Sequence, residues 1–198
     1  MMAHKMDIDI WEVIEAASTK PFGFMPFYPG PGVGGHCIGK DPLYLYWKAK
    51  YFGFRSRFIK LASDIITSMP EYVVVRLEEL LKLKNIEFKK ARILVVGVTY
   101  KKDIKDLRKS PSVDIIDILQ KRSIAVSYFD SLIPYLKLNH INLKSIELKK
   151  AELEKFDCVV IATDHSSVDY AFLLKNSTLI FDTRCVYKRT KDKKVVKL

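Results

Sequence analysis

The hydrophobic positions of the chain follow a helical period in its first half. Between residues 60 and 84 they recur every four residues, at Leu61, Ile65, Met69, Val73, Leu77 and Leu81. This spacing places them on one face of an α-helix. We therefore predict one long amphipathic helix over residues 60–84. Pro70 lies inside it and predicts a kink or a restart, with Ser68 as the cap of the second part.

A segment rich in glycine and proline separates two further helical patterns ahead of this helix. Residues 8–18 have a helical pattern, and residues 42–52 form an aromatic-rich helical pattern. Asp41 and Pro42 predict the start of the second helix, with Asp41 as N-cap and Pro42 at the first helical position. Residues 27–40 between them contain too many glycines and prolines for a helix or a strand.

The second half of the chain alternates between short apolar runs and helical segments. The runs are residues 92–98, 124–130, 158–163 and 179–182, and the helices are predicted from Pro111 to about Gln120 and over about 148–155. Such alternation predicts a parallel, doubly wound sheet covered on both faces. We thus expect an α/β protein with two parts, a helical segment over residues 1–84 and a sheet domain over 90–198.

Composition narrows the classes of function. The 198 residues are 48% hydrophobic and carry a net charge of +11, which indicates a packed protein with an anionic partner or simply a lysine-rich, solvated surface. We find no helix-turn-helix, zinc-finger or aromatic RNA-binding signature, no membrane-length apolar run and no signal peptide. The three cysteines are far apart, which predicts free thiols in the cytoplasm and no metal site.

Cys37 is the strongest candidate for chemistry. It follows the loop Gly30-Pro31-Gly32-Val33-Gly34-Gly35-His36. The glycines let the backbone approach a ligand closely, and Lys40 and the start of a helix favour a thiolate. We therefore predict that Cys37 is a nucleophile. His36 is read as a loop residue, Cys158 as an inert core residue in a strand, and Cys185 stays ambiguous.

Basic and polar residues follow the predicted strands. In an open α/β sheet, ligands bind beyond the carboxyl ends of the strands, where this sequence places Asp130, His165 and the cations Lys101, Lys102, Arg108 and Arg184. The first strand has a single glycine, Gly97, and no dinucleotide fingerprint. The cations therefore predict a ligand that carries phosphate, although any one of them can equally be an exposed surface residue.

Taken together, these motifs resemble the UDP-glucose/GDP-mannose dehydrogenase family over nearly the whole chain. The resemblance is carried by residues 20–42 with Gly-Gly-His-Cys at 34–37, by Met69–Val74, by Gly97–Pro111, by Val160–His165 and by Asp182–Arg184. It implies a Rossmann-like C-terminal domain that binds a UDP-sugar, UDP-glucose or more closely a UDP-N-acetylhexosamine. It also implies oxidation of the sugar C6 alcohol to a carboxylate with two NAD⁺.

The resemblance assigns roles to individual residues. Cys37 would form a thiohemiacetal and then a thioester, and Asp41 would assist water and proton transfer. Lys40 and Arg108 would approach NAD. Substrate would be held by Phe27, Tyr28, Gly30, Gly32, Gly34, Gly35, Tyr100, Lys101 and Arg184. The long helix over 60–84 would form a homodimer.

The chain also departs from the family pattern. Family members are about twice as long, and their N-terminal Rossmann domain, catalytic lysine and asparagine match nothing in this sequence. We therefore expect a C-terminal portion that does not turn over by itself. Two other hypotheses stay open: a non-enzymatic module that dimerises or binds UDP, and a nucleic-acid binder driven by charge, which lacks any recognition element.

Overall fold

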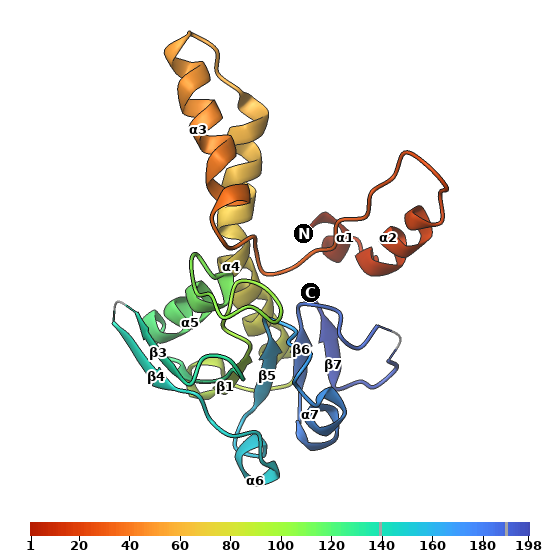
Figure 1. Ribbon diagram of the computed structural model, residues 1–198. Helices are drawn as coiled ribbons and strands as arrows, with labels where there is room; N and C mark the ends of the chain where they lie inside the picture. The colour runs from red at the N-terminus through yellow and green to blue at the C-terminus, as the bar shows by residue number, and fades with distance from the viewer. Residues whose placement is uncertain (139, 189) are drawn as a thin grey trace.

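A parallel sheet of five strands forms the centre of the C-terminal half (Figure 1). The computed structural model describes residues 1–138, 140–188 and 190–198. The strands run in the order β2-β1-β5-β6-β7, and every neighbouring pair is parallel. They are β1 (Arg92–Val96), β2 (Ala125–Phe129), β5 (Cys158–Ile161), β6 (Ile180–Asp182) and β7 (Val195–Lys197). The predicted doubly wound α/β fold is confirmed.

Helices cover both faces of this sheet. One face packs on α5 (Pro111–Lys121) and on the C-terminal half of α4 (Arg57–Leu83), and the other on α6 (Lys150–Leu153) and α7 (Tyr170–Asn176). Pro111 opens α5, as predicted, and Ser110 occupies the N-cap position. Each face buries its own apolar cluster, so the sheet is enclosed as the continuous apolar strands require.

Several short elements were not predicted. They are α1 (Met2–Lys5), the 3-10 turn η1 (Phe88–Lys90), the antiparallel pair β3 (Tyr135–Leu138) and β4 (Ile141–Lys144), α7 and β7. The strands among them have three or four residues and interleave lysine with apolar residues. Elements this short lack a periodic pattern, so their conformation depends on the neighbouring segments with which they pair or pack.

The long helix differs from its prediction at both Pro70 and Ser68. α4 has 27 residues, begins after Ser56 as N-cap and continues through Pro70, so the predicted restart is wrong. The Ser68 hydroxyl donates to the Ile65 carbonyl at 2.9 Å inside the helix rather than capping a new one. A proline in a helix costs about 3 kcal/mol. Burial of Val73, Leu77 and Leu81 below it contributes about 1.5–3 kcal/mol each, which outweighs that cost.

The helix after the glycine-rich loop also begins earlier than predicted. α3 spans Cys37–Tyr51, with His36 at the N-cap position and Pro42 inside the helix. The Lys40 N–H donates to the His36 carbonyl at 3.1 Å, which closes a helical turn ahead of Pro42. Asp41 is therefore not the N-cap, and Cys37 is itself the first helical residue.

The N-terminal half extends away from the sheet in two directions (Figure 1). α3 and the N-terminal half of α4 form a projecting helical hairpin. α1, α2 (Ile10–Ser18) and the following loop form an arm on the side of β6 and β7. Asp9, the N-cap of α2, accepts from Lys197 Nζ at 2.9 Å, and Tyr72 Oη lies 3.1 Å from His4 Nδ1. These contacts tie the arm to β7 and α4.

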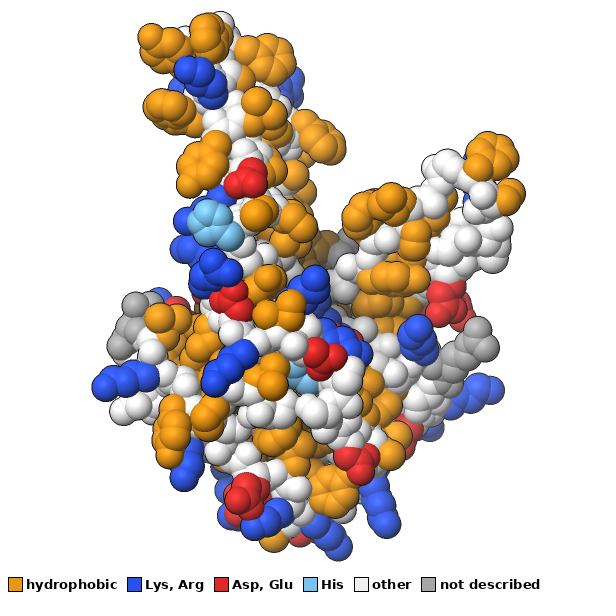
Figure 2. All heavy atoms as spheres, viewed as in Figure 1, with side chains coloured by type: hydrophobic (Ala, Val, Ile, Leu, Met, Phe, Trp, Pro, Cys, Tyr) orange, Lys and Arg blue, Asp and Glu red, His pale blue; other side chains and the backbone are white. Residues whose placement is uncertain are grey.

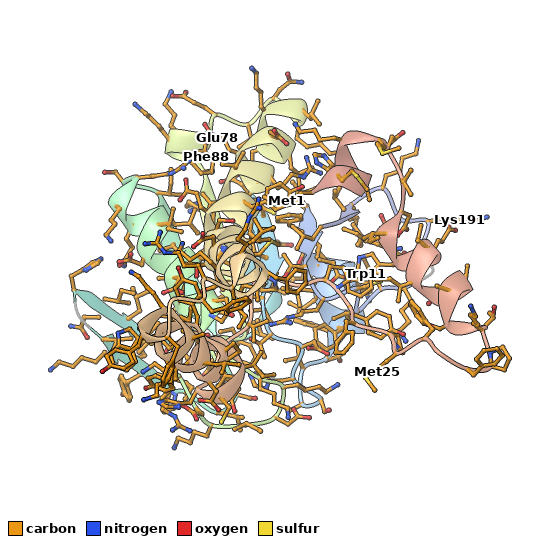
Figure 3. All side chains as sticks on the ribbon, turned by 90° about the horizontal axis from the view of Figure 1, so that it is seen from above. Met1, Trp11, Met25, Glu78, Phe88 and Lys191 are labelled. Carbon is orange, nitrogen blue, oxygen red and sulfur yellow. The ribbon has the colours of Figure 1, made fainter. Side chains whose placement is uncertain are left out.

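Apolar side chains gather on the surface of both projections (Figure 2). On the hairpin they include Trp47, Phe58 and Leu61, each more than half exposed. Viewed from above, Met25 lies at the outside of the arm, whereas Trp11 lies between α2 and the sheet (Figure 3). Among the described residues, no helix combines the length and apolar character needed to span a bilayer.

Candidate functional site

The glycine-rich loop crosses the sheet at the carboxyl ends of its strands. The Gly35 N–H donates to the Arg108 carbonyl at 3.0 Å. A Cβ built on Gly34 would lie 2.4 Å from Tyr100 Cβ and 2.8 Å from the Lys109 carbonyl oxygen, and one on Gly32 would lie 3.1 Å from Pro111 Cγ. Gly34 is thus required by the space, because any side chain there would collide with backbone. The loop is held directly against residues 100–111.

Arg184 supports the other end of the same loop. Its guanidinium is half-buried, Nε donates to the Ala162 carbonyl at 2.7 Å, and a Cβ on Gly30 would lie 2.7 Å from Nη1. Burial lowers the pKa of Arg184, and Asp164 partly opposes this. Within the described part of the chain, Asp164 pairs with Lys102 at 3.7 Å, and no carboxylate forms an ion pair with Arg184. A desolvated cation without a carboxylate partner favours an anionic ligand.

Three other predicted ligand-binding residues lie on the loop after β1. Tyr100 is half-buried under Gly34 and Gly35, while Lys101 is exposed. Arg108 is exposed and forms a bidentate pair with Asp106, with Nη2 at 2.7 Å from Oδ2. Asp106 raises the pKa of Arg108 through these hydrogen bonds, and Cys37 lies near enough to contribute. The predicted cations thus gather at one sheet edge, although Lys102 and Arg108 already have carboxylate partners.

Cys37, the predicted nucleophile, follows directly after the glycine-rich loop. Cys37 is exposed, and Cys158 and Cys185 are buried, so the prediction that Cys158 is a core residue is confirmed. Asp41 is exposed and lies four residues after Cys37 in α3. The two side chains therefore share one helix face, which follows only because α3 begins at Cys37.

Phe27 and Tyr28, the two aromatic residues predicted to hold substrate, have different surroundings in the structure. Tyr28 stacks on Trp11, with ring centroids 5.7 Å apart and an interplanar angle of 13°. Phe27 is 78% exposed and contributes no packing to the site. A role of either ring in holding a base or sugar stays a prediction. Trp11 was not among the predicted site residues, since a tryptophan in an amphipathic helix gives no signal for a stacking partner.

An apolar cavity of about 610 Å³ lies beside the loop, between α3 and α4. Its walls include Gly35, Lys40, Leu43, Ile66 and Pro111. Lys40 therefore lines a cavity that the glycine-rich loop also borders. The sequence pattern did not predict this cavity, because it arises from the crossing of two helices.

Buried polar groups at the strand ends fix the loops that follow β1 and β6. Asp182 accepts from the backbone N–H of Arg184 at 3.1 Å and of Tyr187 at 2.9 Å. Burial raises the pKa of this carboxyl, against the effect of the backbone hydrogen bonds. Asp130 accepts from the Val98 N–H at 2.7 Å and pairs with the buried His165. The sequence placed these residues at the sheet edge and did not assign them a positioning role.

Comparison with known proteins matches both halves of the chain. Residues 1–66 match the central domain of the UDP-glucose/GDP-mannose dehydrogenase family, and residues 94–189 match the UDP binding domain of the same family. The chain belongs to the UDP-glucose/GDP-mannose dehydrogenase family. The UDP binding match covers Tyr100, Arg108 and Arg184, and the central match covers the glycine-rich loop and Cys37.

Members of this family with similar sequences are dehydrogenases of UDP-N-acetylhexosamines. The UDP-N-acetyl-D-mannosamine dehydrogenase of Pyrococcus horikoshii is 34% identical over 95% of this chain and 43% of its own length. The UDP-N-acetyl-D-glucosamine 6-dehydrogenase of Pseudomonas aeruginosa is 41% identical over 64% of this chain and 30% of its own.

Solved structures agree with these sequence matches. The UDP-D-ManNAc dehydrogenase structure from Pyrococcus horikoshii superposes with a TM-score of 0.81 at 30% identity, over 99% of this chain and 45% of that one. Cap5O of Staphylococcus aureus, a UDP-N-acetyl-mannosamine dehydrogenase, superposes with a TM-score of 0.72 at 28% identity, over 99% of this chain and 44% of that one. The chain therefore spans less than half the length of these relatives.

Proposed function

We propose that this chain is the nucleotide-sugar-binding and thiol-bearing part of a UDP-sugar 6-dehydrogenase, with a UDP-N-acetylhexosamine as substrate. One observation carries the proposal. The glycine-rich loop lies over the half-buried guanidinium of Arg184 at one end and delivers the exposed Cys37 at the other. If a diphosphate binds Arg184, the attached sugar would extend along the glycine-rich loop towards the Cys37 sulfur.

The proposed reaction uses Cys37 for covalent catalysis. Loss of a hydride and a proton converts the C6 alcohol into an aldehyde. The Cys37 sulfur attacks the aldehyde carbon to form a thiohemiacetal, and loss of a second hydride and proton leaves a thioester. Water then cleaves the C–S bond, which releases the carboxylate and the thiol. Asp41, on the same face of α3, would accept the proton of that water.

NAD⁺ would supply the oxidant by accepting one hydride in each oxidation. Lys40 at the cavity wall and Arg108 beside Cys37 suit its negatively charged pyrophosphate. Both residues place positive charge near the thiol.

We expect this chain to bind UDP, with a Kd in the micromolar range or weaker. Isothermal titration calorimetry measures this directly. Arg184→Ala removes a charged hydrogen-bond donor, which typically contributes about 1.5–3 kcal/mol, so it should weaken binding about 10- to 100-fold. Lys101→Ala should weaken binding less, because Lys101 is exposed and its charge is screened by water.

Lys175→Ala provides the matched control for a lost surface cation. Lys175 lies in the last turn of α7, away from the glycine-rich loop, and its loss should leave the Kd unchanged. Arg184→Lys keeps the charge and loses the fork of donors, so its affinity should be intermediate. Absence of any heat for the wild-type protein, or equal affinities for wild type and Arg184→Ala, would contradict the proposal.

We further propose that the chain forms a homodimer through the exposed half of α4. The helix has one apolar stripe, of which Val73, Leu77 and Leu81 are buried while Leu61 and Ile65 are 58% and 46% exposed. A charge placed at Leu61 would be desolvated in such an interface. Leu61→Glu should therefore convert dimer to monomer in light scattering. Leu83→Glu, at the other end of α4 where Leu83 is 79% exposed, should not. A monomeric wild-type chain would exclude the interface.

A further inference from the structure

The loop that carries Tyr100 and Lys101 is held from beneath by one buried histidine. His165 has no exposed surface. Its Nδ1 accepts from the Asp103 N–H at 3.0 Å, and its Nε2 lies 3.1 Å from Asp130 Oδ2 and 3.1 Å from Thr99 Oγ1. Both ring nitrogens are therefore engaged, one with the loop and one with the end of β2.

These partners determine where the ring proton lies. A backbone N–H always donates, so Nδ1 must present its lone pair to Asp103. An Asp130 carboxylate can only accept, so Nε2 must carry the proton. The Thr99 hydroxyl donates to the Lys101 carbonyl at 2.9 Å, which leaves Thr99 Oγ1 able to accept from Nε2 as well. Only the neutral ring protonated on Nε2 satisfies every contact.

The hydrogen bond between the Asp103 N–H and His165 stabilises a residue with an unfavourable backbone conformation. Asp103 has a φ of +58°, in the left-handed region that costs a residue with a side chain about 1 kcal/mol. Its carboxylate accepts from the Ser166 N–H at 2.8 Å and the Ser166 hydroxyl at 2.7 Å. The loop between Thr99 and Asp103 is thus clamped at both ends to residues 165 and 166.

We propose that His165, neutral and protonated on Nε2, is a positioning residue that fixes loop 99–103 and so holds Tyr100 under the glycine-rich loop, with Lys101 next to it in the chain. It reaches a nucleotide only through this loop and is not itself a catalytic residue. The inference rests on the proposed function, since it takes Tyr100 and Lys101 as ligands of the UDP-sugar, the role that the family resemblance implies for them. It adds a residue that the substrate does not touch.

The charges around the ring define how it should respond to acid. Asp130 faces it from the end of β2 and Asp103 from the loop, while Lys102 pairs with Asp164 and Tyr170 of α7 donates to the His165 carbonyl. Burial lowers the pKa of His165. The hydrogen bond and charge of Asp130, together with Asp103, raise this pKa by more than burial lowers it, so the pKa lies above its ordinary value. A proton added at Nδ1 would face the Asp103 N–H and release it.

Nuclear magnetic resonance of the 198-residue chain with ¹⁵N-labelled histidine tests the proton assignment. At a pH above the His165 titration, we expect the proton on Nε2 and a bare Nδ1. On acidification, the amide signal of Asp103 should shift together with the His165 ring signals. His140→Asn provides the control, because His140 is 51% exposed and pairs with Asp117 outside this loop. A proton found on Nδ1 at a pH above the His165 titration overturns the proposal.

Two variants test the consequence for binding. His165→Leu removes both ring nitrogens, so the Asp103 amide should lose its protection from hydrogen exchange and the Kd for UDP should rise about three- to tenfold, the range expected for one lost hydrogen bond. His165→Asn places Oδ1 where Nδ1 lies and should keep both the protection and most of the affinity. This rescue would not follow from a role in packing alone. Equal losses in both variants, or none in His165→Leu, overturn the proposal.

The two proposals fail in different ways. A wild-type chain that protects the Asp103 amide but binds no UDP overturns the proposed function and, with it, the link from His165 to a nucleotide. A chain that binds UDP equally well with leucine at 165 overturns the inference and leaves the proposed function standing. If His165→Leu does not fold, the ring assignment in wild type and the His165→Asn affinity still decide the question.

Discussion

Iodoacetamide is expected to alkylate Cys37 at least about a hundredfold faster than Cys158 or Cys185 in the folded chain. Cys37 is exposed, and the other two are buried. Burial raises the pKa of both Cys158 and Cys185, so at neutral pH little of either is present as the reactive thiolate. Each buried thiol must also wait for the structure to open locally. Peptide mass spectrometry after a timed quench measures the three rates.

Cys37→Ser should abolish the fast phase and leave the slow labelling of the other cysteines unchanged. An excess of a UDP-sugar should slow the labelling of Cys37, because the proposed sugar site lies beside the sulfur. Cys158→Ser with the same reagent provides the matched control, since it removes a thiol that contributes nothing to the fast phase. Fast modification of Cys185, or a Cys37 as slow as the buried pair, would contradict the proposed role of the thiol.

Gly97→Ala is expected to lower the free energy of unfolding by about 2–5 kcal/mol. Gly97 follows β1 with a φ of +82°, and an added Cβ would lie 2.2 Å from the Thr163 carbonyl oxygen. The left-handed conformation contributes about 1–2 kcal/mol of this loss, and the collision with fixed backbone contributes the remainder. β1 and β5 are paired, so the clash forces apart two central strands. Urea unfolding followed by circular dichroism measures the change.

Gly53→Ala separates these two contributions. Gly53 has a φ of +81°, which matches that of Gly97, and a Cβ there meets no atom within 4 Å. It should therefore cost only the conformational part, about 1–2 kcal/mol. A Gly97→Ala loss no larger than the Gly53→Ala loss would show that the strand ends can separate freely. The UDP site would then be less rigid than the proposed function requires.

The order of the main strands and helices in the C-terminal half could be predicted, because the hydrophobic pattern or the start signal of each of these elements shows whether it is a strand or a helix. Continuous apolar runs at β1 and β5 indicate strands buried on both faces, and Ser110-Pro111 specifies a helix start through backbone chemistry alone. β3, β4 and β7 could not be predicted, since three or four residues that include a lysine satisfy no period. Their conformation depends on the neighbouring strand or loop.

The two wrong helix boundaries share a physical cause. Local rules place Pro42 at a helix start and treat Pro70 as a kink or restart, because a proline inside a helix removes one backbone hydrogen bond. Both lie inside helices here. Below Pro70, burial of the apolar stripe against the sheet outweighs the lost bond. At α3, the bond from Lys40 to His36 closes the first turn ahead of the proline.

From its residues alone, this chain specified its family, its α/β layering, a thiol directly after a glycine-rich loop and a set of cations at one sheet edge. Those features are written in contiguous residues or in a repeating period. The sequence could not specify that Cys37 opens a helix and shares a face with Asp41, that Arg184 lies beneath Gly30 with no carboxylate partner among the described residues, or that His165 clamps the loop of Tyr100. Each depends on distances between residues far apart in the chain, which come into existence only when the strands align and bury their polar ends together.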